Sequence, residues 1–313
     1  MLPIIDIAPL AGLDPMARLT TAGQIRAAAM DKGFFYVTDH GVPESLSRAV
    51  FEQAKALFAL PATTKSALSR SRSRANRGYE ALGGPALEPG ASALKEAFSI
   101  GPELSPDDPR VLAGRFSQGP NQWPPRAPEF RRTMLAYHQA MFAVAGRLMR
   151  GLALSLDMPE AAFDGFCRQP IALLQLEHYP AQQVAVENAA AHTDVGALTL
   201  LLQDETGGLE VFDRDAGAWI AAPPIPGAFV VNLGDLIGRW TNDVYRPALH
   251  RTVNRSGRER YSAPFFFSGA PDHPVACLET CLEPGAEPLY PPTTVEAHLM
   301  AMHARTYGEA RAS

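Results

Sequence analysis

His192 and Asp194 are separated by one residue in the segment Ala191–Leu200 (AHTDVGALTL). In an extended chain, residues i and i+2 point to the same side, so both side chains can reach one metal ion from a strand end. His250, in the segment Leu249–Val253 (LHRTV), is the best candidate for a third ligand. Two histidines and one carboxylate form the facial triad that binds non-haem iron and leaves positions open for a bidentate co-substrate and O2. The three residues therefore predict an Fe(II) site.

Each of these residues also has an ordinary structural explanation. An isolated His-x-Asp pair arises by chance in many proteins, and a single histidine such as His250 more often packs in a core or faces solvent. The remaining histidines fit that explanation, namely His40, His138, His178, His273, His298 and His303. The metal hypothesis therefore needs a second feature in the same part of the chain.

Arg260 and Ser262 supply that feature, because they follow His250 closely and share one face of an expected strand. A guanidinium binds a carboxylate through two parallel N–H groups, and a neighbouring hydroxyl donates to the same group. Arg260 alone would be assigned to a surface strand, because a buried arginine needs an anionic partner. The ordered series His-x-Asp, His, Arg-x-Ser is much harder to obtain by accident and predicts an anion-binding site beside the metal.

The elements that position these residues lie in the second half of the chain. From about residue 170 to Gly269, short apolar segments alternate with Gly, Pro and Asp turns. Many short strands at this spacing predict an antiparallel barrel or jelly roll. The expected strands are Ile171–Tyr179, Leu198–Gln203, Leu209–Phe212, Trp219–Ala221, Phe229–Asn232 and Tyr261–Phe267.

Helices are expected around this β-rich half, so the predicted fold class is mainly β with flanking helices (α+β). Apolar residues recur at helical spacing, and the longest such pattern should lean on a large surface. Two more strands are expected in the first half, at Pro3–Ile7 and Gly33–Thr38. The expected helices are Met16–Lys32, Glu44–Leu60, Glu129–Leu156 and Val295–Tyr307.

Side-chain alternation extends the candidate site. Gln175, Glu177 and Tyr179 share one face of their strand, and polar residues on that face indicate that it looks into a cavity. Phe266 shares a face with Ser262, which places it deeper on the substrate side or, equally, in ordinary core packing. Gln175, Glu177 and Phe266 are therefore candidate substrate-pocket residues.

Composition excludes several classes of protein. A chain of 313 residues that is 46% hydrophobic can bury a sizeable core. A net charge of −5 argues against nucleic acid or an anionic membrane as the main partner. Three cysteines without a Cys-x-x-Cys pair indicate no disulfide framework, and the first residues do not resemble a secretory signal. We expect a cytoplasmic protein that acts on a small molecule, with its oligomeric state left open and a monomer compatible.

The segment Ser69–Arg77 carries four arginines interspersed with serines. Such a pattern can bind RNA, but the acidic composition argues against it. A solvated loop is the preferred interpretation, and the Gly/Pro run Gly83–Gly90 that follows fits it. A cover near the active site, or an anion contact for substrate, is the alternative, because long loops of this kind are often functional.

These motifs resemble those of the isopenicillin N synthase-like family of 2-oxoglutarate/Fe(II)-dependent dioxygenases, and specifically its bacterial members. The resemblance covers most of the chain. It is carried by PIID, GFFYVTDHGVPE, Arg77–Tyr79, Lys95–Ile100, Gly119–Trp123, HYP, AHTDVGALTL, GGLEV, VNLGDL, WTN, HRTV and Arg260–Phe267. It implies a double-stranded β-helix (jelly-roll) core, Fe(II), and 2-oxoglutarate and O2 as co-substrates.

Residue by residue, the resemblance assigns the iron ligands to His192, Asp194 and His250. It assigns the distal carboxylate of 2-oxoglutarate to Arg260 and Ser262, and matches Tyr179 to a tyrosine that often hydrogen-bonds the same co-substrate. Plant members commonly carry asparagine two residues before that tyrosine, where this chain has Glu177. That departure leaves the role of position 177 open.

The resemblance implies oxidation of a small organic substrate at a C–H bond, usually by hydroxylation, with release of succinate and CO2, and no catalytic side chain beyond the metal site. Two alternatives remain: an Fe(II) oxidase or oxidative cyclase that does not consume 2-oxoglutarate, and a non-catalytic jelly-roll binding protein. The expected organisation is an N-terminal dioxygenase region (1–120), a connecting segment with the long helix (121–169), the double-stranded β-helix core (170–270) and a C-terminal helical tail (271–313).

Overall fold

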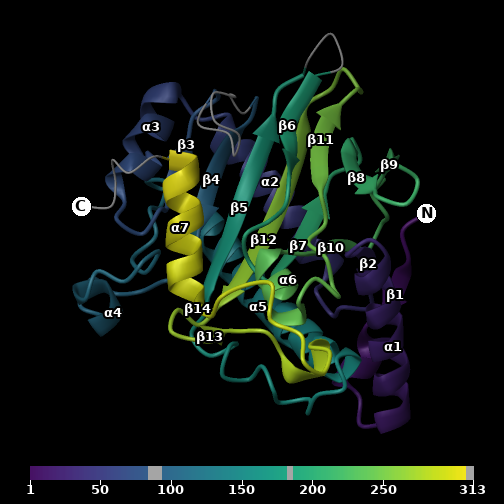
Figure 1. Ribbon diagram of the computed structural model, residues 1–313. Helices are drawn as coiled ribbons and strands as arrows, with labels where there is room; N and C mark the ends of the chain where they lie inside the picture. Colours follow the sequence, from purple (N-terminus) through teal and green to yellow (C-terminus); the bar gives the residue numbers. More distant parts are fainter. Residues whose placement is uncertain (84–93, 182–185, 308–313) are drawn as a thin grey trace.

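The computed structural model describes residues 1–83, 94–181 and 186–307 and is built on two facing antiparallel sheets (Figure 1). The major sheet has eight strands in the order β1-β2-β10-β7-β12-β5-β4-β3, and the minor sheet has four in the order β6-β11-β8-β9. Only the β1–β2 pair of these strands is parallel. This arrangement confirms the predicted β-rich core with flanking helices.

The N-terminal part of the chain contributes both edges of the major sheet. Strands β1 and β2 adjoin β10, and β3 and β4 adjoin β5. The strands of the major sheet are β1 (Ile4–Asp6), β2 (Phe34–Thr38), β3 (Gly78–Glu80), β4 (Glu96–Ile100), β5 (Ile171–Tyr179), β7 (Leu198–Gln203), β10 (Phe229–Leu233) and β12 (Arg260–Gly269). The others are β6 (Val186–His192), β8 (Leu209–Asp213), β9 (Ala218–Ala221) and β11 (His250–Asn254) of the minor sheet, with the small hairpin pair β13 (Pro274–Val275) and β14 (Thr293–Thr294).

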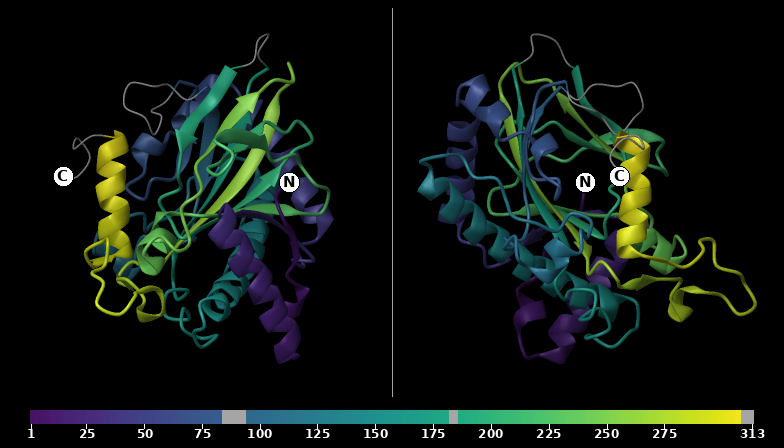
Figure 2. Two further views of the ribbon diagram at one scale, coloured as in Figure 1. Left: turned by 45° about the vertical axis from the view of Figure 1, so that its right-hand side comes forward. Right: turned by 90° about the vertical axis from the view of Figure 1, so that its left-hand side faces the viewer.

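Helices cover the outer face of the major sheet, and one helix lies on the opposite side (Figure 2). The long helix α5 packs against α1, α2, β7 and β12. This agrees with the expectation that the longest helix leans on a large surface. The helices are α1 (Pro15–Asp31), α2 (Glu44–Phe58), α3 (Ala62–Ala67), α4 (Pro109–Leu112), α5 (Pro128–Ser155), α6 (Asp235–Thr241) and α7 (Val295–Tyr307). Three short 3-10 turns join them, at Ala8–Ala11, Arg70–Arg72 and Glu279–Cys281.

The main apolar core lies between the major sheet and its helices. Helix α2 shows how the sequence builds it, because Val50, Ala54, Leu57 and Phe58 recur on one side of the helix and are all buried. Aromatic rings of β12, including Phe265 and Phe267, enter the same core. A second, smaller cluster that includes Phe34, Leu201 and Val211 lies between the two sheets. The core thus fixes the outer face of the sheet and leaves the space between the sheets for a site.

Each expected strand and helix has a counterpart in the structure, but several shorter strands and helices were missed. Strands β6 and β11, which end and begin at the candidate metal ligands, were not among the expected strands. No helix or strand was expected between Leu60 and Glu129, where the structure has α3, β3, β4 and α4. Short strands of this kind depend on partners distant in sequence. Residues 84–90 of the expected loop lie outside the described residues.

Candidate active site

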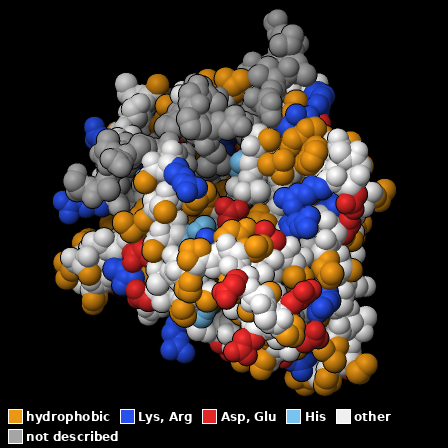
Figure 3. All heavy atoms as spheres, in the orientation of Figure 1, with side chains coloured by type: hydrophobic (Ala, Val, Ile, Leu, Met, Phe, Trp, Pro, Cys, Tyr) orange, Lys and Arg blue, Asp and Glu red, His pale blue; other side chains and the backbone are white. Residues whose placement is uncertain are grey.

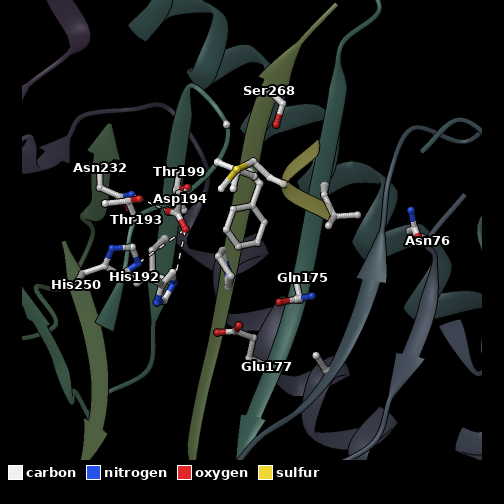
Figure 4. A pocket seen from close by; sticks show the side chains of 18 of the residues that line it. Asn76, Gln175, Glu177, His192, Thr193, Asp194, Thr199, Asn232, His250 and Ser268 are labelled. Atoms are coloured by element: carbon white, nitrogen blue, oxygen red, sulfur yellow. Dashed lines mark hydrogen bonds and ion pairs between the residues drawn. The ribbon is translucent and has the colours of Figure 1, made fainter. Parts of the chain in front are cut away.

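The three predicted iron ligands meet at one end of the minor sheet (Figure 4). His192 closes β6 and His250 opens β11, and these two residues are direct partners in the antiparallel pairing. Their rings lie 4.3 Å apart between centroids. Asp194 follows on the loop after β6, and its Oδ1 lies 3.8 Å from His192 Nε2 and 3.9 Å from His250 Nε2. Strand pairing therefore joins ligands that are far apart in the sequence.

The two oxygens of the Asp194 carboxylate have different surroundings. Oδ2 accepts hydrogen bonds from Thr199 Oγ1 at 2.6 Å and from Asn232 Nδ2 at 2.7 Å. Oδ1 faces the two histidines. His250 is held as well, because its Nδ1 donates to the Ala248 carbonyl oxygen at 3.0 Å, which directs Nε2 toward Asp194. Partners outside the triad thus present one oxygen and two ring nitrogens to the same point.

The donor set fits Fe(II). One ligand atom from each of the three residues lies within 4.8 Å of the others, and two imidazoles with one carboxylate are the set expected for a facial iron site. Burial alone would raise the pKa of Asp194, but His250, His192, Asn232 and Thr199 together hold that pKa below its usual value. Asp194 is therefore a carboxylate, the form that binds a metal.

Arg260 and Ser262 lie on β12 of the major sheet, whereas His192 and His250 lie on strands of the minor sheet. Arg260 is fully buried, donates from Nε to the Gly207 carbonyl oxygen at 2.6 Å and from Nη1 to Ser262 Oγ at 2.9 Å. Gly207 has a φ of +75°, a conformation that glycine adopts without strain and that turns its carbonyl toward Arg260. The Arg260 guanidinium also lies 4.7 Å from the centre of the Tyr179 ring. The structure thus brings the arginine and the serine together, and Arg260 lines the cavity.

Glu177 and Tyr179 complete this part of the site. Strand pairing sets Tyr179 opposite Arg260 and Glu177 opposite Ser262. Both hydroxyls bind the Glu177 carboxylate, because Oε2 accepts from Ser262 Oγ at 2.8 Å and from the Tyr179 hydroxyl at 2.9 Å. Lys95 forms an ion pair with the other oxygen, Oε1. Burial opposes ionisation of Glu177, but Lys95, Ser262 and Arg260 hold the pKa of this carboxyl below its usual value.

One cavity of about 320 Å³ is lined by the three predicted iron ligands and also by Glu177, Tyr179 and Arg260. Its apolar wall includes Phe266, for which the sequence left a cavity position and core packing equally open. Gln175 also lines the cavity and donates to Ser99 Oγ at 3.1 Å. Other side chains that line the cavity include Ile171, Leu173, Pro264, Phe116, Asn76, Leu299, Met302 and His303. Figure 4 shows Gln175 and Glu177 on β5, across the cavity from the triad.

The preferred interpretation of Ser69–Arg77 as a solvated loop is wrong for its buried members. Arg77 is completely buried and donates to Ser117 Oγ at 3.1 Å and to the Ser117 carbonyl oxygen at 2.8 Å. Arg70 pairs with Glu80 at 2.8 Å, and Arg70 and Asn76 line the cavity. Part of the segment therefore belongs to the cavity wall. Its buried Arg77 bonds to a residue distant in the sequence, whereas a polar segment of this composition would be expected to bond to solvent.

Several site residues escaped sequence reasoning. Thr199 and Asn232 donate hydrogen bonds to Asp194. The sequence could have indicated them, because each is a polar residue within an otherwise apolar strand. Leu299 and Met302 on α7 gave no signal, because an apolar residue on a terminal helix usually indicates core packing. His303, assigned an ordinary role from sequence, lines the cavity.

Comparison with known proteins agrees with this geometry. The family described as "2OG-Fe(II) oxygenase superfamily" matches residues 170–269, and "non-haem dioxygenase in morphine synthesis N-terminal" matches residues 2–126. The chain is 44% identical to the 2-oxoglutarate-Fe(II) type oxidoreductase hxnY of Emericella nidulans, over 99% of this chain and 91% of that protein. The chain belongs to the 2OG-Fe(II) oxygenase superfamily.

Other relatives support the same assignment for this superfamily member. It is 39% identical to the 2-oxoglutarate-dependent dioxygenase citB of Monascus ruber, over 98% of this chain and 95% of that one. A full-length Neurospora crassa protein solved in complex with alpha-KG (2-oxoglutarate) has a TM-score of 0.84 and 28% identity, covering 98% of this chain and 96% of the other. That similarity confirms the double-stranded β-helix core.

The protein is therefore a 2-oxoglutarate- and Fe(II)-dependent oxygenase. Bound iron and 2-oxoglutarate supply the chemistry, in which O2 oxidises a C–H bond of the substrate while 2-oxoglutarate is converted to succinate and CO2. The chain supplies geometry, exclusion of water and a shaped pocket. Within the described residues, no helix is both long and apolar enough to cross a membrane. Acidic and basic side chains are interspersed over the face shown in Figure 3.

Proposed function

We propose that His192, Asp194 and His250 bind the Fe(II) ion, and that Arg260 with Ser262 and Tyr179 binds the distal carboxylate of 2-oxoglutarate. The observation that carries this assignment is that His192, Asp194 and His250 line the same cavity as Arg260 and Tyr179. The iron ligands converge on one point. Arg260 is a buried cation that lines the same cavity, and a buried guanidinium favours a carboxylate partner.

The Asp194→Ala variant tests the metal assignment, with the Asp31→Ala variant as control because Asp31 is a surface carboxylate that pairs with Lys32 at 2.8 Å, outside the cavity. We expect Asp194→Ala to lose Fe(II) binding and succinate release together, while Asp31→Ala keeps both. Iron binding that survives in Asp194→Ala would refute the assignment. Arg260→Met should keep iron and lose 2-oxoglutarate affinity, measured by anaerobic calorimetry.

We further propose a small, largely apolar substrate with hydrogen-bonding groups at one end. Ile171, Leu173 and Phe266 form an apolar wall, and Gln175 and Asn76 supply amide groups beside it. The Neurospora crassa protein has also been solved with thymine and with 5-formyluracil, at TM-scores of 0.84 and 0.81. Planar heterocycles of that size are the first compounds to test here, with succinate release that tracks O2 uptake as the readout.

Hydroxylation is the proposed outcome, because it requires no side chain beyond the metal ligands to complete the reaction. The alternative of an oxidase or cyclase that spares 2-oxoglutarate would appear as O2 uptake without succinate, and a non-catalytic binding protein would show neither.

Two interpretations of the sequence stay predictions. One is the division into regions 1–120, 121–169, 170–270 and 271–313. The other is the narrower assignment to bacterial isopenicillin N synthase-like enzymes; the curated relatives named above are fungal. A cytoplasmic location is likewise proposed, from three free cysteines.

A further inference from the structure

The hydroxyl protons of the co-substrate pocket are already used within the protein. A hydroxyl has one proton to donate. Ser262 Oγ accepts from Arg260 Nη1 at 2.9 Å and gives its proton to Glu177 at 2.8 Å. Tyr179 gives its proton to the same Glu177 oxygen at 2.9 Å. A carboxylate from solution therefore meets two hydroxyls whose protons point to another carboxylate.

Charge in this pocket is balanced for one incoming carboxylate. Arg260 and Lys95 bring two positive charges, and Glu177 brings one negative charge. These three side chains all line the cavity, and Glu177 and Arg260 are buried whereas the Lys95 side chain keeps 22% of its exposure. The distal carboxylate of 2-oxoglutarate would bring their sum to zero. With a neutral residue at position 177, the pocket would hold two uncompensated cations.

We propose that Glu177 sets the affinity for 2-oxoglutarate, because it competes with the distal carboxylate of that co-substrate for the protons of Ser262 and Tyr179. When 2-oxoglutarate binds, Glu177 yields at least one of these protons and keeps its ion pair with Lys95. Lys95 therefore has two roles: it is the counter-ion of Glu177 and a second cation facing the co-substrate. The competition keeps the affinity for 2-oxoglutarate below the value that Arg260, Ser262 and Tyr179 would set alone.

Position 177 need not carry a charge to complete the strand. Glu177 pairs with Ser262 and Ala97 through the backbone of β5, and a glutamine has nearly the same shape. The alternative is that Glu177 only holds Lys95 and the two hydroxyls in place. That alternative predicts the opposite sign, because glutamine would then loosen the pocket and weaken 2-oxoglutarate binding.

The experiment measures the Kd of 2-oxoglutarate by anaerobic calorimetry on the Fe(II)-loaded enzyme. We expect Glu177→Gln to bind about tenfold more tightly than the natural protein, and Lys95→Met, which leaves the pocket without net charge, about tenfold more weakly. The double variant restores the charge sum and should fall between the two. Glu259→Gln is the matched control, because Glu259 is an exposed carboxylate whose Oε2 accepts from the Tyr261 hydroxyl at 3.0 Å, outside the cavity; its Kd should not change.

A second ligand separates the pocket from the metal. 2-Oxobutanoate has the keto acid group but no distal carboxylate, so its affinity should be the same in the natural protein and in Glu177→Gln. Equal or weaker 2-oxoglutarate binding in Glu177→Gln would overturn the inference, as would unchanged binding in Lys95→Met. The inference rests on the proposed co-substrate site, and Arg260→Met tests that site by itself: unchanged 2-oxoglutarate binding there would overturn both.

Discussion

Removing the Thr199 hydroxyl tests whether the protein orients the Asp194 carboxylate before iron arrives. Thr199→Val keeps the shape of the side chain and deletes the hydrogen bond of 2.6 Å to Asp194 Oδ2. Asn232 still donates to the same oxygen at 2.7 Å. The carboxylate then keeps one of its two hydrogen bonds, so the orientation of Oδ1 toward the two histidines is less tightly fixed.

The size of the effect follows from the type of bond. A hydrogen bond to a charged group contributes about 1.5–3 kcal/mol, and each 1.4 kcal/mol corresponds to about tenfold in affinity. Because Asn232 still orients the carboxylate in part, we expect Thr199→Val to lose an energy at the lower end of this range, which raises the Kd of Fe(II) about tenfold. That value agrees with the roughly 10- to 100-fold losses typical of residues that orient metal ligands.

The assay is an anaerobic Fe(II) titration in competition with a chelator of known affinity, alongside thermal unfolding of the metal-free protein. Thr206→Val is the control, because Thr206 Oγ1 donates at 3.0 Å to the Glu259 carbonyl oxygen, away from the cavity. It should leave the Kd of Fe(II) unchanged. The reasoning is refuted if Thr199→Val binds Fe(II) within about twofold of the natural protein while Asp194→Ala does not bind.

Three further predictions concern the frame of the site. A Cβ on Gly234 would lie 2.6 Å from the Asp194 carbonyl oxygen. Gly234→Ala should therefore displace the loop that carries Asp194 and weaken Fe(II) binding more than about tenfold in the same titration. Gly23→Ala is the control, because a Cβ there meets no atom within 4 Å, and it should leave Fe(II) binding unchanged. Glu296, in the first turn of α7, accepts from Arg115 Nε at 3.1 Å with both oxygens, and this contact ties α7 to a distant part of the chain. Glu296→Gln should speed amide hydrogen exchange in α7 about tenfold, and unchanged exchange would show that the contact does not stabilise the helix. Burial alone would raise the pKa of Glu96, but hydrogen bonds to His178, Lys65 and Tyr79 lower it to about 2. The ionised carboxylate therefore contributes about 3 kcal/mol to the free energy of unfolding above pH 4.5, and this contribution is lost as the pH falls toward 2. In urea unfolding, the difference in free energy of unfolding between the natural protein and Glu96→Gln should disappear over this pH range.

The sequence was sufficient for residues whose role follows from their type and spacing. His192 and Asp194 were predictable as a pair because residues two apart in an extended segment share a side, although Asp194 lies on the loop after β6. The same rule placed Gln175, Glu177 and Tyr179 on one face of β5, and all three line the cavity. The helix over Glu44–Phe58 was predictable because its apolar residues recur at helical spacing. These features depend only on neighbours along the chain.

Only the tertiary structure decided which distant residues meet. The pairing of β6 with β11 places His250 opposite His192, and the pairing of β5 with β12 places Glu177 opposite Ser262. Register of this kind depends on the packing of whole strands, which no short segment encodes. For the same reason, nothing in the residue pattern indicated that Lys95 would pair with Glu177, or that residues of α7 would line the cavity. The sequence determined the chemistry that the side chains can perform, and the fold determined which of them act on the same molecule.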